Sequence, residues 1–270
     1  MIIPTKATAP QTTRIRKRVQ SVQRALRLLL LFGQETREWG VTELSRSLQL
    51  PKTVVFRLLC TMQELGFVEQ NPQSQKYRLG RSVFEIAVVY AGQSDLIGIA
   101  DHFLRSLVAE TQRTAQLGVL DGTMNLSLIV VPSPLMVRVN IRPGDRKPAH
   151  ATATGKVLLA GLTDDAVRRL YPTGTLQVVT PTTLSTVDQL ISQLDEIRAQ
   201  GYSLNCEEST EGITGTASPV RDYQGRTVAG LSLSWPTQLV PQSEAAGLIQ
   251  KVVLAAKEMS QRLGSSLPLY

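Results

Sequence analysis

His150 and Cys206 are the side chains whose chemistry would suit nucleophilic catalysis, with the imidazole as base and the thiol as nucleophile. Such a dyad needs a third group that orients the base, and the sequence offers none at a recognisable spacing. Glu207 and Glu208 could act as paired carboxylates, but adjacent residues on a strand point to opposite faces of the sheet. We therefore expect a hydrogen-bonded structural role for His150, and a protein that is not an enzyme.

Two further patterns suggest a phosphate or metal site, and both fail on spacing. Residues 154–156, Thr-Gly-Lys, end like a phosphate-binding loop. The first glycine of the GxxxxGK[ST] pattern, however, would fall on a histidine and its last position on a valine. His102 is the other histidine of the sequence, and two cysteines cannot supply a four-ligand zinc site. We expect neither a metal nor a cofactor.

Signals for secretion or membrane insertion are weak. No apolar stretch approaches the roughly 18 residues of a membrane span. The first residues place their basic cluster after the apolar ones, which is not the order of a secretory signal. Asn125-Leu126-Ser127 matches the acceptor pattern for N-glycosylation. We expect a cytoplasmic protein with no membrane partner, in which that acceptor is not used.

Positive charge is confined to the first third of the chain. The whole sequence has a formal net charge of +7, whereas residues 1–80 alone carry 13 Lys/Arg against 5 Asp/Glu, a net of +8. Half of that excess comes from Arg14, Arg16, Lys17 and Arg18, and the other half remains without them. A basic excess limited to one domain favours a polyanionic partner, nucleic acid first and an anionic membrane surface second.

A predicted helix over residues 51–65 carries the side chains best suited to contact DNA. Its core-facing arc is apolar and consists of Val55, Leu58, Leu59, Met62 and Leu65. On the opposite side, Lys52 and Arg57 can contact phosphates or guanine edges, and Thr53 a phosphate or a base. Phe56 lies on the same side and has two interpretations. It could contact thymine methyl groups, or pack against a neighbouring domain or a partner subunit.

Three helices and a hairpin must position these side chains. The apolar spacing predicts helices over residues 19–32, from 40 to 48 and over 51–65, followed by strands over 67–69 and 76–79. Thr42 is the expected N-cap of the second helix, and Arg78 stands at the base of the hairpin. This is the layout of a winged helix-turn-helix. Residues 1–18 are expected to form a flexible basic arm.

The same stretch resembles a known family. GVTELSRSLQLPKTVVFRLLCTMQELGFVEQNPQSQKYRLG, residues 40–80, is similar to the winged helix-turn-helix of the IclR-type (isocitrate lyase regulator) bacterial transcription factors. The matching elements include T-E-L, the L-P turn, R-L-L, the L-G-F-V entry to the wing and its Y-R-L-G exit. The resemblance implies a DNA-binding domain over residues 19–80, a linker helix over 81–94, and dimer contacts near the first helix.

A second domain begins where the apolar period changes towards two, near residue 115. The predicted strands cover residues 116–120, 126–131, 136–141, 202–206, 216–220 and 227–235. The predicted helices cover residues 95–112, 154–161, 164–170, 186–200 and 242–263. Strands first and last with helices between them indicate an α+β domain built on an antiparallel sheet flanked by helices.

The family resemblance continues through this domain. PGDRKPAHATATGKVLLAGL and GYSLNCEESTEGITGTASPVRDYQGRTVAGLSLSWP resemble two segments of the family's effector-binding domain. The resemblance implies a GAF-like sensor over residues 95–265 and a homodimer or homotetramer. Matched to the family motifs, the effector-binding positions are Ala153, Thr154, Asn205, Gly215, Ser232 and Ser234.

Two of these positions depart from the family pattern. Family members with small carboxylate effectors commonly have Asp where this chain has Asn205, and a bulkier residue where it has Gly215. Asn carries no charge and can donate as well as accept, and glycine leaves more room. We therefore expect a larger or differently polar ligand, such as an aromatic or multi-carbon carboxylic acid. Without the family, Ser232 and Ser234 are also explained as polar residues alternating on a half-buried strand.

The combined expectation is a transcriptional regulator, repressor or activator, that binds a double-stranded operator and responds to a small-molecule effector. RNA polymerase is a further expected partner. The alternative is an enzyme that acts on a small acid and uses its N-terminal domain only for dimerisation. A third class is an interaction module for an anionic membrane or a protein. Sequence-selective DNA binding would separate the first class from the other two.

Overall fold

The computed structural model describes residues 19–33, 38–92 and 95–265. The chain forms two compact units, Met1–Val89 and Tyr90–Tyr270, and the division falls within α4 (Arg81–Gly92). The expected basic arm, residues 1–18, lies outside the described residues. None of the helices in the described ranges combines the length and the apolar character of a membrane span. The same ranges hold no group of three His, Cys, Asp or Glu side chains placed to bind a metal.

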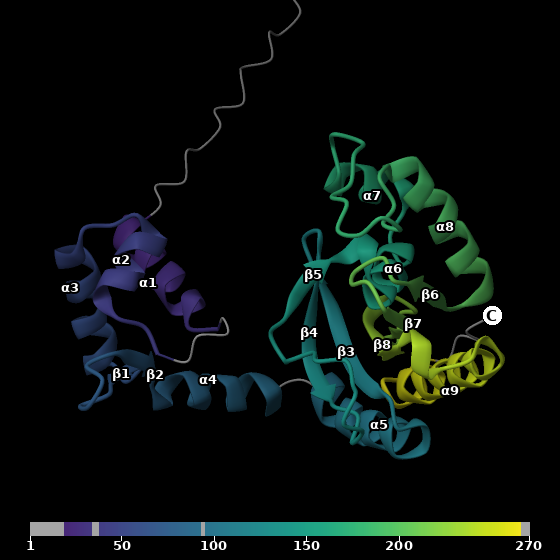
Figure 1. The fold of residues 1–270 in the computed structure, drawn as a ribbon, viewed down its shortest axis with the longest axis horizontal. Coiled ribbons are helices and arrows are strands. Elements are labelled where there is room, and N and C mark those ends of the chain that lie inside the picture. The colour runs from purple at the N-terminus through teal and green to yellow at the C-terminus, as the bar shows by residue number, and fades with distance from the viewer. Residues whose placement is uncertain (1–18, 34–37, 93–94, 266–270) are drawn as a thin grey trace, which may run out of the picture. The chain divides into compact units, whose positions relative to one another are not determined.

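The N-terminal unit is a three-helix core followed by a two-stranded wing (Figure 1). Its elements are α1 (Gln20–Leu31), α2 (Val41–Leu48), α3 (Lys52–Glu64), β1 (Val68–Gln70) and β2 (Tyr77–Leu79). The two strands are antiparallel. Each element contributes apolar side chains to one core: Leu28, Phe32, Leu44, Val55, Leu59, Met62, Val68 and Tyr77. The predicted winged helix-turn-helix is confirmed.

Two local predictions for this unit were wrong. Thr42 is not the N-cap of α2, because the helix begins at Val41 and its N-cap is Gly40, two residues earlier; the Gly40 N–H donates to Glu43 Oε2 at 2.7 Å. Leu65 does not share the buried arc of α3 and is 62% exposed. The helix ends at Glu64, so Leu65 no longer follows the helical spacing that placed it on that arc.

The C-terminal unit is built on one six-stranded antiparallel sheet, with strand order β5-β4-β3-β8-β7-β6. The strands are β3 (Thr114–Asp121), β4 (Met124–Val131), β5 (Arg146–Pro148), β6 (Ser203–Cys206), β7 (Ile213–Arg221) and β8 (Thr227–Pro236). Antiparallel pairing of neighbours in the chain, β3 with β4 and β7 with β8, agrees with the α+β prediction.

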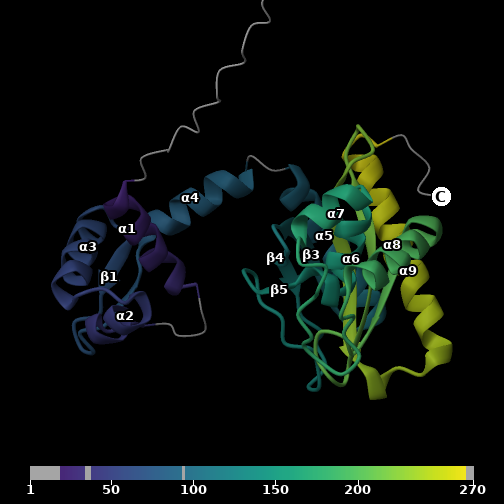
Figure 2. The same cartoon turned by 90° about the horizontal axis from the view of Figure 1, so that it is seen from above.

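Helices cover both faces of this sheet (Figure 2). On one face, α5 (Asp95–Thr111) and α9 (Gln242–Arg262) enclose a core that includes Leu104, Leu117, Leu231, Leu233 and Trp235. On the other face lies α6 (Ala153–Ala160), with α7 (Asp164–Leu170) and α8 (Val187–Gln200) forming the second core with it. Two 3-10 turns, Ala149–Ala151 and Thr237–Leu239, complete the unit.

The strand predicted over residues 136–141 is absent; the structure describes this segment as irregular. The edge of β4 is paired instead with the three residues of β5, at Met124–Leu126. Met136 is 98% exposed, so its apolar character does not reflect burial. The segment is held by a side chain rather than by a strand ladder, because Thr114 Oγ1 donates to the Val139 carbonyl at 3.2 Å.

Candidate functional site

The exposed side of α3 presents the four residues that the sequence singled out on this helix: Lys52, Thr53, Phe56 and Arg57. All four are exposed, and within the described ranges neither Lys52 nor Arg57 is held in an ion pair. Because α3 buries Val55, Leu59 and Met62, its opposite side is left to solvent. Two unpaired cations and a hydroxyl on the first two turns are suited to a phosphate backbone and base edges.

The turn before α3 fixes its direction relative to α2. Gln49 adopts a left-handed conformation with φ of 54°, which ends α2. Ser45 then closes the turn, because its hydroxyl donates to the Leu50 carbonyl at 2.6 Å and its own carbonyl accepts the Leu50 N–H at 3.1 Å. Pro51 follows as the N-cap residue of α3.

Arg78 differs from the α3 cations because it is already paired. It lies on β2 directly opposite Glu69 of β1, and its Nε donates to Glu69 Oε1 at 2.5 Å. Lys76, on the same hairpin, pairs with Glu43 at 3.1 Å. The structure therefore places Arg78 on the wing, but with part of its charge already neutralised.

Phe56 borders a groove between α1 and α3. The groove is lined by mostly apolar or small side chains, among them Val22, Ala25, Phe56, Cys60 and Met62. Phe56 is 52% exposed, so it is neither a core residue nor fully in solvent. Both of its sequence interpretations, contact with thymine methyls and contact with a partner, are compatible with this position.

The C-terminal unit holds a polar pocket between the sheet and the start of α6. All six positions that the family resemblance assigned to an effector line it: Ala153, Thr154, Asn205, Gly215, Ser232 and Ser234. Ten further residues complete the lining: Gln116, Asn125, Ser127, Val139, Ile141, Asp145, Lys147, Thr152, Ser209 and Ile213. Nine of the sixteen lining side chains carry a hydroxyl or an amide, so the pocket can form hydrogen bonds with a ligand.

A chain of buried hydrogen bonds runs across the floor of the pocket. Ser127 Oγ donates to Gln116 Oε1 at 2.8 Å, and Gln116 Nε2 donates to Thr154 Oγ1 at 3.2 Å. The Thr154 hydroxyl in turn donates to Ser232 Oγ at 2.9 Å. This order leaves the Ser232 hydrogen as the end of the chain, available to an acceptor.

Asn205 closes the side of the pocket formed by β6. It is 3% exposed and bonds the backbone at both ends of its amide: Nδ2 donates to the Ala151 carbonyl at 2.5 Å, and Oδ1 accepts the Glu208 N–H at 3.3 Å. An aspartate could accept the second bond but could not donate the first. In this chain Asn205 therefore ties the segment before α6 to the loop after β6.

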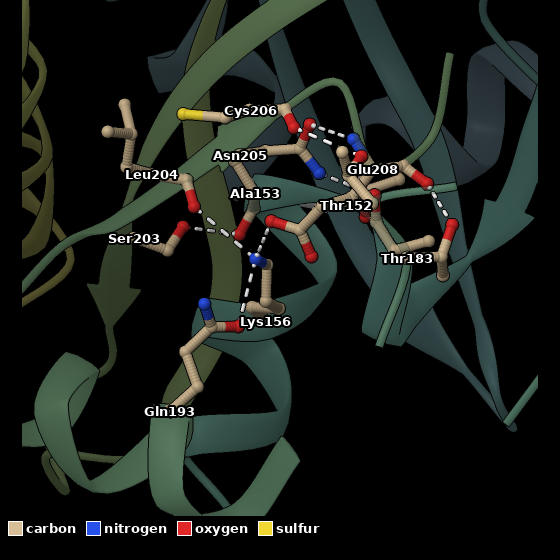
Figure 3. A network of polar contacts seen from close by, with 12 residues as sticks. Thr152, Ala153, Lys156, Thr183, Gln193, Ser203, Leu204, Asn205, Cys206 and Glu208 are labelled. Atoms are coloured by element: carbon tan, nitrogen blue, oxygen red, sulfur yellow. Dashed lines mark hydrogen bonds and ion pairs between the residues drawn. The ribbon is translucent and has the colours of Figure 1, made fainter. Parts of the chain in front are cut away.

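A buried ion pair anchors α6 beneath this contact (Figure 3). Lys156 is 0% exposed, and its Nζ donates to Glu208 Oε1 at 2.5 Å, Gln193 Oε1 at 3.0 Å and the Leu204 carbonyl at 3.3 Å. Three acceptors match the three N–H donors of an ammonium group. Burial lowers the pKa of Lys156, and the neighbouring Glu208 carboxylate opposes that shift.

The side chains considered for catalysis each have a separate structural environment and do not form one site. His150 is buried, and its Nε2 lies 2.9 Å from the Gln177 carbonyl; burial lowers the pKa of this imidazole. Glu207 has φ of 63° and its Oε2 accepts the Gly212 N–H at 3.0 Å, whereas Glu208 turns inward to Lys156. Burial raises the pKa of the Cys206 thiol, which disfavours its nucleophilic thiolate form.

Sequence reasoning missed the part of the lining that comes from β4 and β5. Asn125 and Ser127 were noted as a glycosylation pattern, yet both are buried and line the pocket. The available signal was their spacing, since residues two apart on a strand share a face. Lys147, on β5, lies directly opposite Asn125. Its Nζ donates to Thr210 Oγ1 at 2.8 Å.

A winged helix-turn-helix joined to a unit with a polar ligand pocket defines a transcription factor that responds to a small molecule. Comparisons with known proteins identify the family of transcription factors to which the chain belongs. The family description "Bacterial transcriptional regulator IclR C-terminal" matches residues 88–261, and "IclR helix-turn-helix domain" matches residues 21–72. The chain belongs to the IclR family of bacterial transcriptional regulators.

Relatives and solved structures agree with this assignment. The chain is 36% identical to the HTH-type transcriptional regulator XynR of Escherichia coli (strain K12), over 91% of this chain and 98% of that protein. The structure resembles that of an IclR transcriptional regulator from Alicyclobacillus acidocaldarius, with a TM-score of 0.83 and 26% identity over 92% of this chain and 100% of the other. It shares its fold with an IclR homologue from Microbacterium hydrocarbonoxydans solved with 4-hydroxybenzoate, with a TM-score of 0.81 and 23% identity over 90% and 98% of the two chains.

Proposed function

We propose that this regulator binds a pseudo-palindromic operator through α3 as a homodimer or homotetramer, and that a small organic acid bound in the C-terminal pocket changes operator binding. The observation that carries the proposal is the pocket itself. Six residues drawn from α6, β6, β7 and β8 by family motif alone all line one polar cavity. Because bacterial operator DNA lies in the cytoplasm, we propose that the protein acts there.

The DNA interface follows from which cations are free to bind phosphate. Lys52 and Arg57 stand on the exposed side of α3, while Thr53 supplies a hydroxyl and Phe56 an apolar surface for thymine methyls. Arg78 would have to exchange Glu69 for a phosphate, so we assign it a smaller share of the affinity. Each phosphate contact releases counterions and adds about 0.9 to the salt dependence of binding.

Exposed apolar side chains on α1 support an oligomer. Val22, Leu26 and Leu30 recur at helical spacing and are each more than half exposed. Such a stripe on a soluble helix favours contact with a partner, here a second copy of the chain. Two heads in one oligomer would read the two halves of a pseudo-palindrome. RNA polymerase is the additional partner we propose for an activating role.

The acid group of the effector belongs at the start of α6. The Gly155 N–H is already capped by Thr152 Oγ1 at 2.9 Å, so the first-turn donors that remain at the positive end of the helix dipole are the N–H groups of Ala153 and Thr154, and both residues line the pocket. Ser232, at the end of its hydrogen-bond chain, supplies a further donor. Gly215 also lines the pocket, where a Cβ would lie 3.1 Å from Ser234 Oγ.

The effector changes operator binding only if it binds the DNA-competent and DNA-free states with different affinities. The curated relatives are named as transcriptional regulators. We accordingly propose that the pocket is used for sensing and not for turnover.

The test is operator binding by Arg57→Ala, measured by fluorescence anisotropy on the DNA upstream of the gene across a range of salt concentrations. Loss of one charged contact should weaken binding by about 10- to 100-fold and lower the salt slope by about 1. Arg105→Ala is the matched control, because Arg105 is an exposed arginine of the other unit, paired with Asp101 at 2.7 Å. Unchanged affinity and slope in Arg57→Ala would remove α3 from the interface.

A further inference from the structure

Helix α1 has three different sides, and one of them has no role yet. The side that includes Leu28 is buried in the helical core, and a second side carries the exposed apolar stripe that includes Leu26. The third side consists of four polar residues spaced three and four positions apart: Gln20, Gln23, Arg24 and Arg27. Because α1 contains no acidic residue, this third side is cationic. We call it the basic face of α1.

Both arginines of the basic face lack a counter-ion. Among the residues that the structure describes, neither Arg24 nor Arg27 forms a hydrogen bond or an ion pair. The carboxylates that pair with other cations of this unit, Glu43 and Glu69, hold Lys76 and Arg78 of the wing instead. Arg24 is also half-buried. An arginine that loses water without gaining an acceptor is suited to bind an anion from outside.

The basic face adjoins the part of the unit that is proposed to bind DNA. Both of its arginines line a hollow against Leu48 and Leu50, which belong to the turn that leads into α3. Arg24 in addition lines the groove between α1 and α3, which it shares with Phe56 and Arg57. A DNA strand in contact with the first turns of α3 would therefore also pass close to the basic face.

The chemistry of the basic face fits the DNA backbone better than the bases. The major groove admits one helix, and α3 is the helix proposed to enter it, so α1 can reach only sugars and phosphates. Side chains three positions apart on a helix have Cβ atoms about 5–6 Å apart, so Arg24 and Arg27 can approach the same phosphate group. Guanidinium groups bind phosphate oxygens with two parallel hydrogen bonds.

We infer that α1 is a second DNA-binding helix, in which Arg24 and Arg27 hold a backbone phosphate beside the major groove that α3 occupies. The inference rests on the proposed function, which places α3 in that groove. A phosphate contact carries no base sequence, so it raises the affinity for any duplex and fixes the position of α3 on the DNA. Because the neighbouring side of α1 carries the apolar stripe, a movement of α1 at the oligomer contact would also move this phosphate contact.

The experiment measures DNA binding by the full-length protein over a range of salt concentrations, using fluorescence anisotropy. Two duplexes of equal length are compared: the DNA upstream of the gene, and a scrambled sequence of the same composition. Arg24→Ala and Arg27→Ala should each weaken binding by about tenfold and lower the salt slope by about 0.9. The loss should be the same on both duplexes, because the phosphates of the two are alike.

Arg81→Ala is the matched control, because it removes one exposed arginine from the same unit. Arg81 lines a separate hollow with Glu64, at the end of α3 opposite Lys52, so the salt slope should stay unchanged. Arg24→Lys and Arg27→Lys keep the charge and should keep the slope of the wild type, which a purely structural role would not require. Urea denaturation followed by Trp39 fluorescence confirms that each variant is folded, and sedimentation measures its oligomeric state.

Three outcomes overturn the inference. They are an unchanged salt slope in both alanine variants, a loss confined to the upstream DNA, and a loss of the oligomer at unchanged slope. The last outcome would assign the arginines to acidic groups of a second copy. The proposed function is judged separately by Arg57→Ala. If only Arg57→Ala lowers the slope, α3 remains the DNA-binding helix and the role of α1 is refuted, whereas a wild-type protein that binds neither duplex refutes both.

Discussion

Lys156→Met should destabilise the C-terminal unit more than any surface substitution, because it removes one half of a buried ion pair. Lys156 is 0% exposed and Glu208 is 7% exposed, and the two are joined at 2.5 Å. Without the ammonium group, the Glu208 carboxylate stays buried with no opposite charge. Loss of one partner of a buried pair typically costs about 3–5 kcal/mol.

The structure also predicts that the two charges are coupled. Glu208→Leu leaves the ammonium with Gln193 Oε1 and the Leu204 carbonyl, two neutral acceptors that cannot balance its charge. It should therefore destabilise the unit by a similar amount. The double variant Lys156→Met/Glu208→Leu buries no charge at all and should be less destabilised than the sum of the singles, by about 2 kcal/mol or more.

The assay is urea denaturation followed by tryptophan fluorescence. The chain has two tryptophans, Trp39 in the N-terminal unit and the buried Trp235 on β8. In a Trp39→Phe background, Trp235 alone reports on the C-terminal unit, which avoids treating two units as one transition. Lys251→Met is the control, since loss of its exposed pair with Glu110 should cost less than about 1 kcal/mol. The reasoning is refuted if Lys156→Met costs no more than this control, or if the two single effects simply add.

Three further predictions concern packing and pH. Gly230→Ala should destabilise the C-terminal unit by about 1–3 kcal/mol, because its Cβ would lie 2.8 Å from Thr154 Cγ2 and 3.0 Å from Val157 Cγ2; a wild-type urea midpoint would contradict this. Leu28→Ala should lower the free energy of unfolding of the N-terminal unit by about 2–5 kcal/mol, because Leu28 is fully buried in the helical core. Urea denaturation followed by Trp39 fluorescence measures this loss, and a loss of less than about 1 kcal/mol would count against that core. Burial lowers the pKa of His150 below its usual 6.5. Between that lowered pKa and 6.5, the unfolded state therefore binds more protons than the folded state. The free energy of unfolding should fall as the pH is lowered through this window. Thermal melts from pH 7.5 downwards should show a steeper loss for wild type than for His150→Asn, and parallel curves would exclude the effect.

The helical elements could be predicted from the sequence because their signals are local. Apolar residues at helical spacing identified α1 and α3, and a tight turn at Leu50-Pro51 separated α3 from α2. Helix ends were less secure, as Thr42 shows, because a glycine backbone N–H bonded to Glu43 caps α2 where a side-chain cap was expected. The clearest error was the strand predicted over residues 136–141, where apolar residues are exposed. Residues 136–141 alternate as a strand does, but a strand also needs a free edge to pair with, and sequence alone does not show that β5 takes the edge of β4.

Lys147 and Asn125 show why the pocket could be predicted only in part. The six positions taken from the family lie within motifs, where neighbours in sequence identify them. Lys147 instead meets Thr210, 63 residues away in sequence, because the loop that follows β6 reaches the opposite edge strand, β5. The Asn125–Lys147 pair depends on the register of β4 with β5, and a slip of one residue would place the two side chains on opposite faces of the sheet. Motifs therefore locate the part of the pocket lined by α6, β6, β7 and β8, whereas the part lined by β4 and β5 depends on strand register and has to be read from the structure.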